Sequence, residues 1–208
     1  MIVGRFITLE GGEGAGKSTQ LHALAAALRT RGLDVVETRE PGGSEGAEAI
    51  RALLLTGGAD RWSARAEALL FAAARTDHIE KTIRPALARG AWVLSDRFLD
   101  SSRAYQGQGA LSDADILALH RIGSEGFLPD RTLFLTLPDG EAEARARERD
   151  GDAADRIGGR DQNFHRAVAS AFARFATEEP ARFRAIDASG EAGAVTARLL
   201  DALADLLP

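Results

Sequence analysis

Short apolar runs alternate along the chain with longer stretches of helical periodicity. The apolar runs are rich in β-branched and aromatic residues, as buried strands are. They occupy residues 5–9, 33–38, 91–95, 132–137 and 184–187. The helical patterns occupy residues 17–30, 45–55, 64–89, 112–124, 141–149, 163–178 and 191–206. Pro85 is expected to kink or split the long helix at 64–89.

This alternation predicts an α/β fold. Strands joined through helices need crossover connections, which give a mostly parallel sheet covered by helices on both faces. Five strands fit one three-layer domain. Because no internal repeat or linker divides the chain, we expect a single domain over residues 1–208. The stretch DGDAADRIGG at 150–159, rich in glycine and charge, is expected to be mobile.

The composition excludes several classes of function. The chain of 208 residues has no cysteine, so disulfides and thiolate metal sites are excluded, and its four histidines lack the spacing of a metal site. A net charge of −5 argues against a nonspecific nucleic-acid binder, whose surface is basic. No stretch approaches the roughly 20 apolar residues of a membrane span, and the N-terminus lacks a signal-peptide pattern. We therefore expect a cytoplasmic protein without nucleic-acid or membrane partners.

The segment GGEGAGKS at 11–18 matches the phosphate-binding pattern GxxxxGK[ST], directly after a strand and at the start of a helix. Its glycines let backbone N–H groups converge on phosphate oxygens, and the helix N-terminus adds positive potential. Lys17 is expected to reach the outer phosphates and Ser18 to ligate Mg²⁺. The alternative is a glycine-rich turn without a ligand. The residues expected to bind the triphosphate are Gly11, Gly12, Glu13, Gly14, Ala15, Gly16, Lys17, Ser18 and Thr19.

A nucleoside triphosphate site leaves two classes open, a GTPase-type switch and a transferase. Guanine-reading switches commonly carry an Asn-Lys-x-Asp element, whereas the single asparagine of this chain, Asn163, is followed by phenylalanine. The switch is therefore the minor alternative. A DNA-dependent ATPase is hard to reconcile with the net acidity and the short chain.

A transferase needs a second site for its acceptor, and two further motifs suit one. TREPGG at 38–43 follows the second expected strand, and Asp96 and Arg97 follow the third. Both motifs therefore lie at the carboxyl ends of parallel strands, the edge where such folds bind ligands. The chain continues after Arg97 as FLDSSRAYQGQGA, a run too polar for an ordinary connector.

Together, GGEGAGKST, TREPGG, LLFAAAR, DRFLDSSRAYQG and the later DRI make the chain resemble the bacterial thymidylate kinases. The resemblance runs from the first strand to the last helix. It implies a P-loop nucleoside-monophosphate kinase fold, usually assembled as a homodimer. It also implies transfer of a phosphoryl group from ATP, with Mg²⁺, to dTMP, giving dTDP and ADP in dTTP biosynthesis. A related kinase with another base preference and a non-enzymatic P-loop module are the alternatives.

The resemblance assigns roles around the base and the sugar. Phe71 matches the residue that stacks on thymine, and Arg75, one helical turn later, matches the donor to thymine O4. An arginine only donates, so it suits this O4 acceptor and rejects the amino group of cytosine. Ser102 and Gln106 match contacts of the base and its surroundings, and Tyr105 matches the residue near the 2′ carbon that disfavours ribonucleotides. Taken alone, Phe71 and Tyr105 also fit a packed core, and Arg75 a surface ion pair.

The resemblance assigns the phosphate side as well. Arg97 matches the arginine on the acceptor phosphate. Glu40 and Arg51 match further positions of the monophosphate site, which Leu55 lines. Glu13 matches an acid near the 3′-hydroxyl of the acceptor sugar, and a solvent-facing loop residue is its alternative.

Metal binding and catalysis are expected to involve residues from three parts of the chain. Asp96 follows a hydrophobic strand, as a Walker-B acid does, and is expected to hold Mg²⁺ through water alongside Ser18, although a plain strand-end turn residue would also fit. The expected catalytic residues are Lys17, Arg97 and Arg156. Arg156 belongs to a lid of about 145–161, where the resemblance implies an arginine closing over the ATP phosphates.

Two positions depart from the family pattern. Ala110 stands where the family usually has an arginine, so any phosphate or loop-ordering role of that arginine is lost or moved to Arg103. The lid reads DRIGG instead of DRIE and thus lacks the acid that often follows. Neither departure touches the residues expected to read the base.

Overall fold

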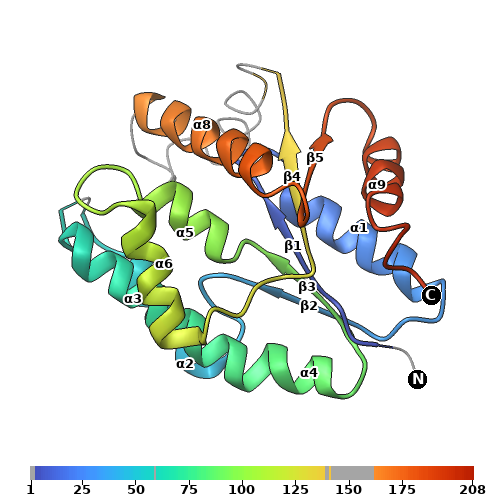
Figure 1. Cartoon of the computed structure of the whole chain (residues 1–208), viewed down its shortest axis with the longest axis horizontal. Coiled ribbons are helices and arrows are strands. Elements are labelled where there is room, and N and C mark those ends of the chain that lie inside the picture. Colours follow the sequence, from blue (N-terminus) through green and yellow to red (C-terminus); the bar gives the residue numbers. More distant parts are fainter. Residues whose placement is uncertain (1–2, 59, 139–140, 142–161) are drawn as a thin grey trace.

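The computed structural model describes residues 3–58, 60–138, 141 and 162–208. Its strands form one parallel sheet in the order β2-β3-β1-β4-β5 (Figure 1). Their bounds are β1 Phe6–Glu10, β2 Val35–Arg39, β3 Trp92–Asp96, β4 Arg131–Thr136 and β5 Phe183–Asp187. The prediction of a five-stranded parallel sheet in an α/β fold is confirmed.

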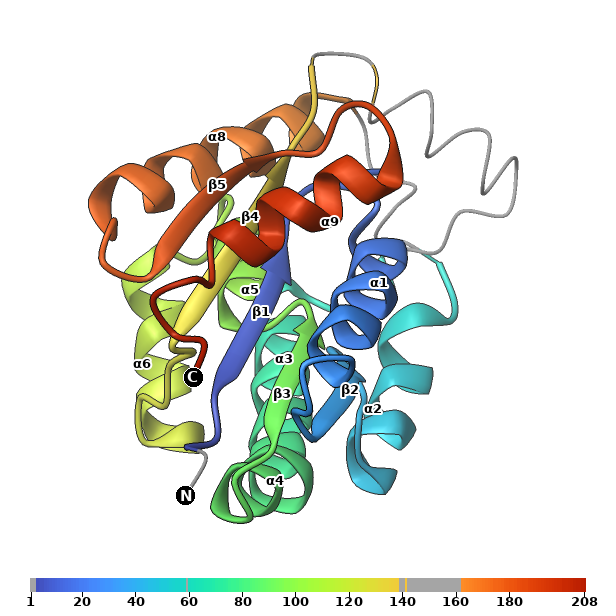
Figure 2. The same ribbon diagram turned by 90° about the vertical axis from the view of Figure 1, so that its right-hand side faces the viewer.

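Helices cover both faces of this sheet. Figure 2 looks onto the face covered by α1 Lys17–Arg29 and α9 Ala192–Asp201. The helices on the opposite face are α3 Ala64–His78, α4 Arg84–Ala88, α5 Leu99–Gln106, α6 Asp113–Ser124 and α8 Gln162–Glu178, and α2 Glu45–Leu55 packs along α3. This arrangement is the expected three-layer architecture. In the part of the chain that the structure describes, no helix is long and apolar enough to span a membrane.

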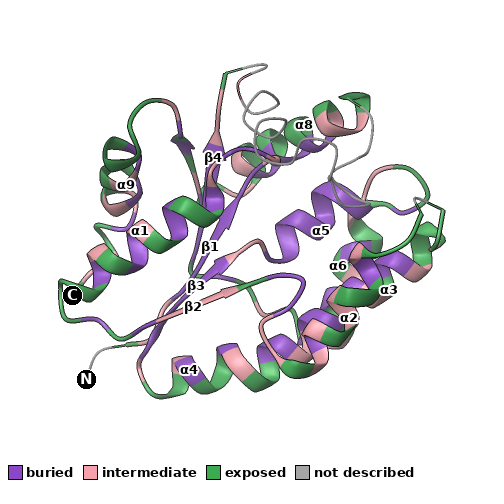
Figure 3. Cartoon of the chain, turned by 180° about the vertical axis from the view of Figure 1, so that it is seen from behind, coloured by how far each residue is buried: buried purple, intermediate pink, exposed green. Residues whose placement is uncertain are grey.

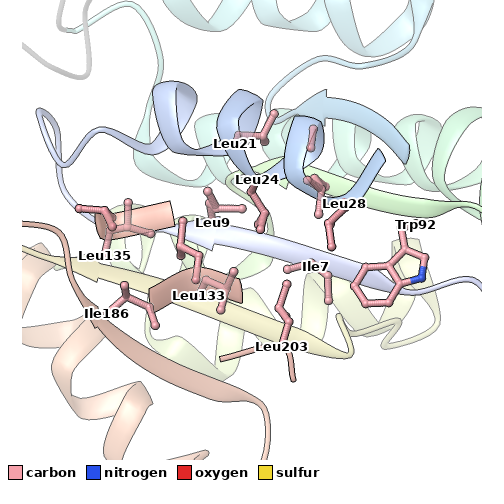
Figure 4. Close-up of a cluster of buried hydrophobic side chains, with 14 of the residues drawn as sticks. Ile7, Leu9, Leu21, Leu24, Leu28, Trp92, Leu133, Leu135, Ile186 and Leu203 are labelled. Atoms are coloured by element: carbon pink, nitrogen blue, oxygen red, sulfur yellow. The ribbon is translucent and has the colours of Figure 1, made fainter. Parts of the chain in front are cut away.

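The central strand β1 contributes side chains to both hydrophobic layers. Ile7 and Leu9 lie among the leucines of α1 and the apolar residues of β4 (Figure 4). Phe6 belongs to the cluster on the opposite face. Since successive side chains of a strand point to opposite faces, Thr8 and Glu10 share the face of Phe6. Glu10 is therefore a fully buried acid at the carboxyl end of β1.

The helix expected at 64–89 is split into parts, as the position of Pro85 suggested. α3 ends at His78, a π-helical turn spans Ile79–Ile83, and α4 begins at Arg84. Proline has no N–H to donate to the carbonyl four residues earlier, so the regular helical bond is lost there.

The stretch after Arg97 contains a helix that the sequence pattern did not predict. α5 is buried along its whole length (Figure 3), so no face of it is solvated. Periodicity identifies a helix by the contrast between an apolar and a polar face, and α5 lacks that contrast because its polar side chains are buried too.

Two further expectations concern the last part of the chain. The final helix, expected to reach residue 206, ends at Asp201 and continues as turns. The helical stretch at 141–149 apart from Glu141, the lid at 145–161 and its Arg156 lie outside the described residues.

Candidate active site

The segment between β1 and α1 folds as a phosphate-binding loop. Gly11, Gly14 and Gly16 have φ angles of 141°, 74° and 82°, which L side chains rarely adopt. The N-cap of α1 is Gly16, which has no side chain to cap the helix, so the first N–H groups of α1 are left for an anion.

Lys17 extends along this loop. Its Nζ donates a 2.7 Å hydrogen bond to the carbonyl oxygen of Gly12. Burial and the nearby positive charge of Arg97 lower the pKa of Lys17 to about 8. A bound triphosphate would favour the charged form of the lysine, because an opposite charge at close range raises the pKa of an amine. Lys17 is therefore placed at the phosphate loop with an amine whose charged form a bound phosphate would stabilise.

A cavity of about 480 Å³ opens at the carboxyl ends of the strands. Its volume is typical of small-molecule sites, which measure roughly 300–1,000 Å³. The cavity connects the phosphate loop with the ends of β2 and β3 and with α2, α3 and α5. The expected site residues that line it are Glu13, Gly14, Gly16, Lys17, Ser18, Thr19, Glu40, Arg51, Leu55, Phe71, Arg75, Asp96, Arg97, Ser102, Tyr105 and Gln106.

Three residues expected to bind the triphosphate, Gly11, Gly12 and Ala15, do not line this cavity. Ala15 is buried, and a Cβ at Gly11 would lie 2.7 Å from the carbonyl oxygen of Leu135. At least Gly11 and Ala15 therefore shape the loop and present no side chain to a ligand.

Four residues line the cavity without having been assigned from the sequence. They are Arg39, Pro41, Phe98 and Ser101. All four lie inside TREPGG and DRFLDSSRAYQG, the two motifs already singled out. Membership of these motifs is the signal that could have found them.

The hydroxyl of Ser18 and the carboxylate of Asp96 meet at the rim of the phosphate loop. Ser18 Oγ donates to Asp96 Oδ2 over 2.5 Å. These hard oxygen donors suit Mg²⁺, which is usually held by one or two protein oxygens and otherwise by water and phosphate oxygens. Within the described residues, no cluster of three or more His, Cys, Asp or Glu side chains is placed to hold a metal. The pair therefore fits a metal that arrives with a nucleotide.

Arg97 lies between the phosphate loop and α5. Its backbone has φ 70°, and its guanidinium donates to Gly11 O over 3.3 Å and to Ser101 Oγ over 3.1 Å. It also forms an ion pair with Glu13, and it lies over the ring of Tyr105. The carboxylate of Glu13 therefore faces the cavity and is 26% exposed.

A buried acid that sequence reasoning missed supports this arginine. The carboxylate of Glu10 accepts the Phe98 N–H over 2.8 Å and the Ser101 hydroxyl over 2.6 Å, so it fixes the start of α5. Burial and the charge of Asp100 raise the pKa of Glu10 to about 7. The signal in the sequence was a charged residue ending an otherwise apolar strand.

The opposite end of the cavity holds a buried arginine beside an aromatic ring. Arg75 is 2% exposed, so the alternative of a surface ion pair is wrong. Its Nε donates to Glu40 over 2.9 Å and its Nη2 to Ser102 over 2.5 Å. Phe71 belongs to a hydrophobic cluster and also lines the cavity, so packing in the core and facing a ligand are compatible for this residue.

The remaining lining residues complete the wall. Tyr105 is buried, and burial raises its pKa to about 12, so the phenol stays neutral. Gln106 donates to Glu67 over 3.2 Å, and Arg51 donates to the carbonyl oxygen of Pro41 over 2.7 Å.

Arg103 does not take over a phosphate role from the arginine that Ala110 replaces. Its guanidinium is 4% exposed, it does not line the cavity, and it binds the carboxylates of Asp100, Asp113 and Glu179. The pair with Asp113 does bridge α5 and α6 across the loop that contains Ala110. Of the two roles that could have moved to Arg103, ordering the loop fits the structure and binding a phosphate does not.

The fold and the cavity define a P-loop phosphotransferase with room for a second substrate beside the triphosphate site. The family model described as thymidylate kinase matches residues 9–199. The chain is 66% identical over 206 residues to a thymidylate kinase of Rhizorhabdus wittichii, which covers 99% of both chains. It is 50% identical over 210 residues to a thymidylate kinase of Caulobacter vibrioides, covering 100% of this chain and 99% of the other.

A solved structure agrees with these sequence relatives. The crystal structure of thymidylate kinase from Ehrlichia chaffeensis superimposes with a TM-score of 0.75 at 31% sequence identity, over 97% of this chain and 98% of that chain. The chain belongs to the thymidylate kinase family.

Proposed function

We propose that this protein transfers the γ-phosphoryl group of ATP to dTMP, giving dTDP and ADP as a step in dTTP biosynthesis. The observation that carries the proposal is one continuous cavity with the phosphate loop at one end and the buried pair of Phe71 and Arg75 at the other. Membership of the thymidylate kinase family supports it.

The end of the cavity formed by α3 and α5 suits the thymine base. The ring of Phe71 offers a stacking surface, and the guanidinium of Arg75 offers N–H donors to the O4 acceptor. Ser102 and Gln106 lie on α5 at the same end, and Tyr105 is placed to pack against the sugar. The buried and neutral phenol of Tyr105 suits a contact with the apolar 2′ carbon.

The other end of the cavity suits the reacting phosphates. The acceptor phosphate of dTMP is largely dianionic at pH 7, because its second pKa is about 6, so its oxygen needs no general base to attack. Lys17 and Arg97 both line the cavity and supply positive charge to the transferring group, and catalysis rests on alignment and neutralisation. Arg51 and Arg39 lie on the acceptor side of the same cavity.

Ser18 and Asp96 would hold Mg²⁺ on this side, the acid acting through water. When bound, the ion neutralises charge on the β- and γ-phosphate oxygens. Arg156 of the lid is proposed to add a cation over the ATP phosphates, although it lies outside the described residues.

We also propose that the protein assembles as a homodimer. Four exposed large apolar residues lie on helices that pack side by side, namely Leu53 of α2, Leu69 of α3, and Leu117 and Ile122 of α6. Ile122 is 80% exposed, and such side chains favour burial against a partner. Ile122→Glu should shift the mass measured by light scattering from dimer to monomer, whereas a monomeric wild type would contradict the proposal.

A cytoplasmic location and a single domain over residues 1–208 stay predictions.

One experiment tests the proposed activity. Purified protein is mixed with ATP, Mg²⁺ and a panel of nucleoside monophosphates, and ADP release is followed. Release that depends on dTMP is the expected result. A preference for dCMP, UMP or AMP would contradict the base assignment, and slow hydrolysis that ignores every monophosphate would indicate a switch instead.

Arg75→Met tests the base-reading role directly, because methionine keeps the apolar stem and removes the donors. Loss of one hydrogen bond from a charged donor costs about 1.5–3 kcal/mol, so we expect the KM for dTMP to rise on the order of 10- to 100-fold and the KM for ATP to change little. Steady-state kinetics at varied concentrations of each substrate separate the two constants. Equal increases in both would contradict the role.

A further inference from the structure

A chain of polar side chains runs behind Arg75, all of them buried except the half-buried Thr38. Thr38 Oγ1 lies 2.7 Å from His78 Nε2, and His78 Nδ1 lies 3.0 Å from Glu40 Oε1. The other oxygen of Glu40 accepts the Nε–H of Arg75, whose Nη2 donates to Ser102. We call this set, Thr38–His78–Glu40–Arg75–Ser102, the Arg75 relay. It joins the end of β2 with α3 and α5.

The chemistry of Glu40 assigns the direction of its hydrogen bond with His78. A carboxylate only accepts, so the nitrogen facing Glu40, Nδ1, carries a proton. His78 Nε2 faces the Thr38 hydroxyl, which can either donate to a ring nitrogen or accept from it. His78 is 0% exposed, and both of its ring nitrogens are satisfied within the relay.

The relay restricts the orientation of Arg75 through Glu40. Each carboxylate oxygen of Glu40 has its own donor, His78 on one and Arg75 on the other. Rotation of the carboxylate would break a buried hydrogen bond, so His78 fixes the plane in which Glu40 receives the guanidinium. The guanidinium also lies over the ring of Phe98, 5.4 Å from its centroid. Arg75 is thus held at two nitrogens and one face.

The charge of the relay matters as much as its geometry. Burial raises the pKa of Glu40, but the charge of Arg75 and the hydrogen bond from His78 outweigh burial and lower it overall, so the acid is ionised. An ionised Glu40 offsets the charge of Arg75. The guanidinium then acts as a donor to an uncharged base and does not compete with Arg97 for the phosphate of the substrate.

The local backbone leaves room for this contact. Gly43 has φ 86°, and a Cβ there would collide with His78 Nε2 and Thr38 Oγ1. The hydroxyl of Thr82, in the π-helical turn directly after His78, donates to Gly43 O over 2.6 Å. Gly43 and the π-helical turn therefore lie next to the Thr38–His78 contact. Such π-helical turns are frequent at functional sites.

We propose that His78 is a positioning residue for base recognition. It holds the carboxylate of Glu40 and, through Glu40, the guanidinium of Arg75, and Thr38 supports His78 in this role. The proposal rests on the proposed function, in which Arg75 reads thymine. It extends specificity to two residues that do not line the base end of the cavity.

The central test compares His78→Leu with His78→Asn. Leucine removes both hydrogen bonds, and by analogy with the outer hydrogen-bond partners of metal ligands we take the cost as on the order of 10- to 100-fold. We expect the KM for dTMP to rise by about this factor, the KM for ATP to stay within about twofold, and the preference for dTMP over dCMP in kcat/KM to fall. Asparagine places an amide donor near the position of Nδ1, so His78→Asn should recover part of the loss.

A matched pair of threonine variants separates positioning from stability. Thr38→Val removes the hydroxyl that meets His78. Thr76→Val removes a hydroxyl of α3 that, among the described residues, donates to its own helix at Ala72 O. We expect Thr38→Val to raise the KM for dTMP several-fold and Thr76→Val to leave it unchanged. Thermal denaturation of all variants supplies the stability reference.

The failure of the inference is distinguishable from the failure of the proposed function. If the wild type prefers dTMP but His78→Leu lowers only kcat and stability, with KM and base preference unchanged, the positioning role is wrong. If the wild type prefers another monophosphate, the proposed function is wrong. In that case the NMR signal of the Arg75 Nε–H still tests whether His78 positions Arg75. Its protection from hydrogen exchange should be lost in His78→Leu and kept in His78→Asn. An unchanged signal in His78→Leu would overturn it.

Discussion

Arg103 provides the sharpest test of how α5 is held. Its guanidinium donates to Asp113 over 2.7 and 2.9 Å, to Asp100 over 3.0 Å and to Glu179 over 2.6 Å. It also lies 4.0 Å from the centroid of the Phe175 ring. We therefore consider Arg103→Met, which keeps an unbranched apolar stem and removes every donor.

The expected loss of stability depends on which partners the three carboxylates retain when Arg103 is removed. Removing one partner of a buried ion pair costs about 3–5 kcal/mol. Asp100 and Glu179 keep Arg182 as a partner, and the side chain of Asp113 is 25% exposed and can be rehydrated. The lower end of the range applies, about 3 kcal/mol. For a chain of this size each kcal/mol shifts Tm by about 2–4 °C, so we expect a drop of about 6–12 °C.

The assay combines thermal and urea denaturation with steady-state kinetics, and Arg174→Met is the matched control. Arg174 lies over the same Phe175 ring, but its side chain is 50% exposed and pairs with an exposed Glu178. The control should stay within about 0.5 kcal/mol of the wild type. For Arg103→Met we expect near-normal KM values at a temperature where it is folded. A normal Tm together with a tenfold rise in the KM for dTMP would refute the reasoning and return Arg103 to a phosphate role.

Two further predictions concern Glu10 and Gly43. The folded pKa of Glu10, about 7, exceeds its ordinary value of 4.5, so the stability it contributes is full below pH 4.5 and is lost as pH rises through 7, a change of about 3 kcal/mol. In urea denaturation, Glu10→Gln should therefore gain about this much relative to the wild type between pH 4.5 and pH 8, and a constant difference would contradict the assignment. Gly43→Ala adds the collision with His78 and Thr38 to backbone strain and should cost more than Gly32→Ala, which has a similar φ of 82° but open space. The same Gly43 variant should raise the KM for dTMP, and equal stability losses in both variants would show that no collision occurs.

The sheet and most helices could be predicted from the sequence because their patterns are local. The run at 5–9 is short, rich in β-branched and aromatic residues and closely followed by glycines, and GGEGAGKS carries its geometry in its own glycines. The residues around the base could be expected only through a resemblance. Arg75 on an isolated helix is equally compatible with a surface ion pair, and nothing in its neighbours along the chain reveals that it is buried.

The parts that could not be predicted depend on contacts between distant residues. Thr38 and His78 are 40 residues apart, and Glu10 and Ser101 are 91 residues apart. The first pairing exists because the end of α3 lies beside the end of β2, and the second because the neighbouring parallel strands β1 and β3 end at the same edge of the sheet. α5 was missed for the same reason, since its polar residues are buried by partners that no local pattern contains.

The ion pairs along the cavity differ in burial in a way that matches the two kinds of chemistry proposed for it. The side chains of the Arg75–Glu40 pair are only 3% and 4% exposed, those of Arg97–Glu13 are 17% and 26%, and those of Arg39–Glu48 are 55% and 42%. Separating the buried Arg75–Glu40 pair would leave an unpaired charge away from water, which is costly in free energy. Separating an exposed pair costs little. The partly exposed pair of Arg97 therefore opens at a lower cost than the pair of Arg75, and Arg39 can exchange a carboxylate for a phosphate at small cost. Arg75 cannot, and this difference keeps it a fixed donor for an uncharged base.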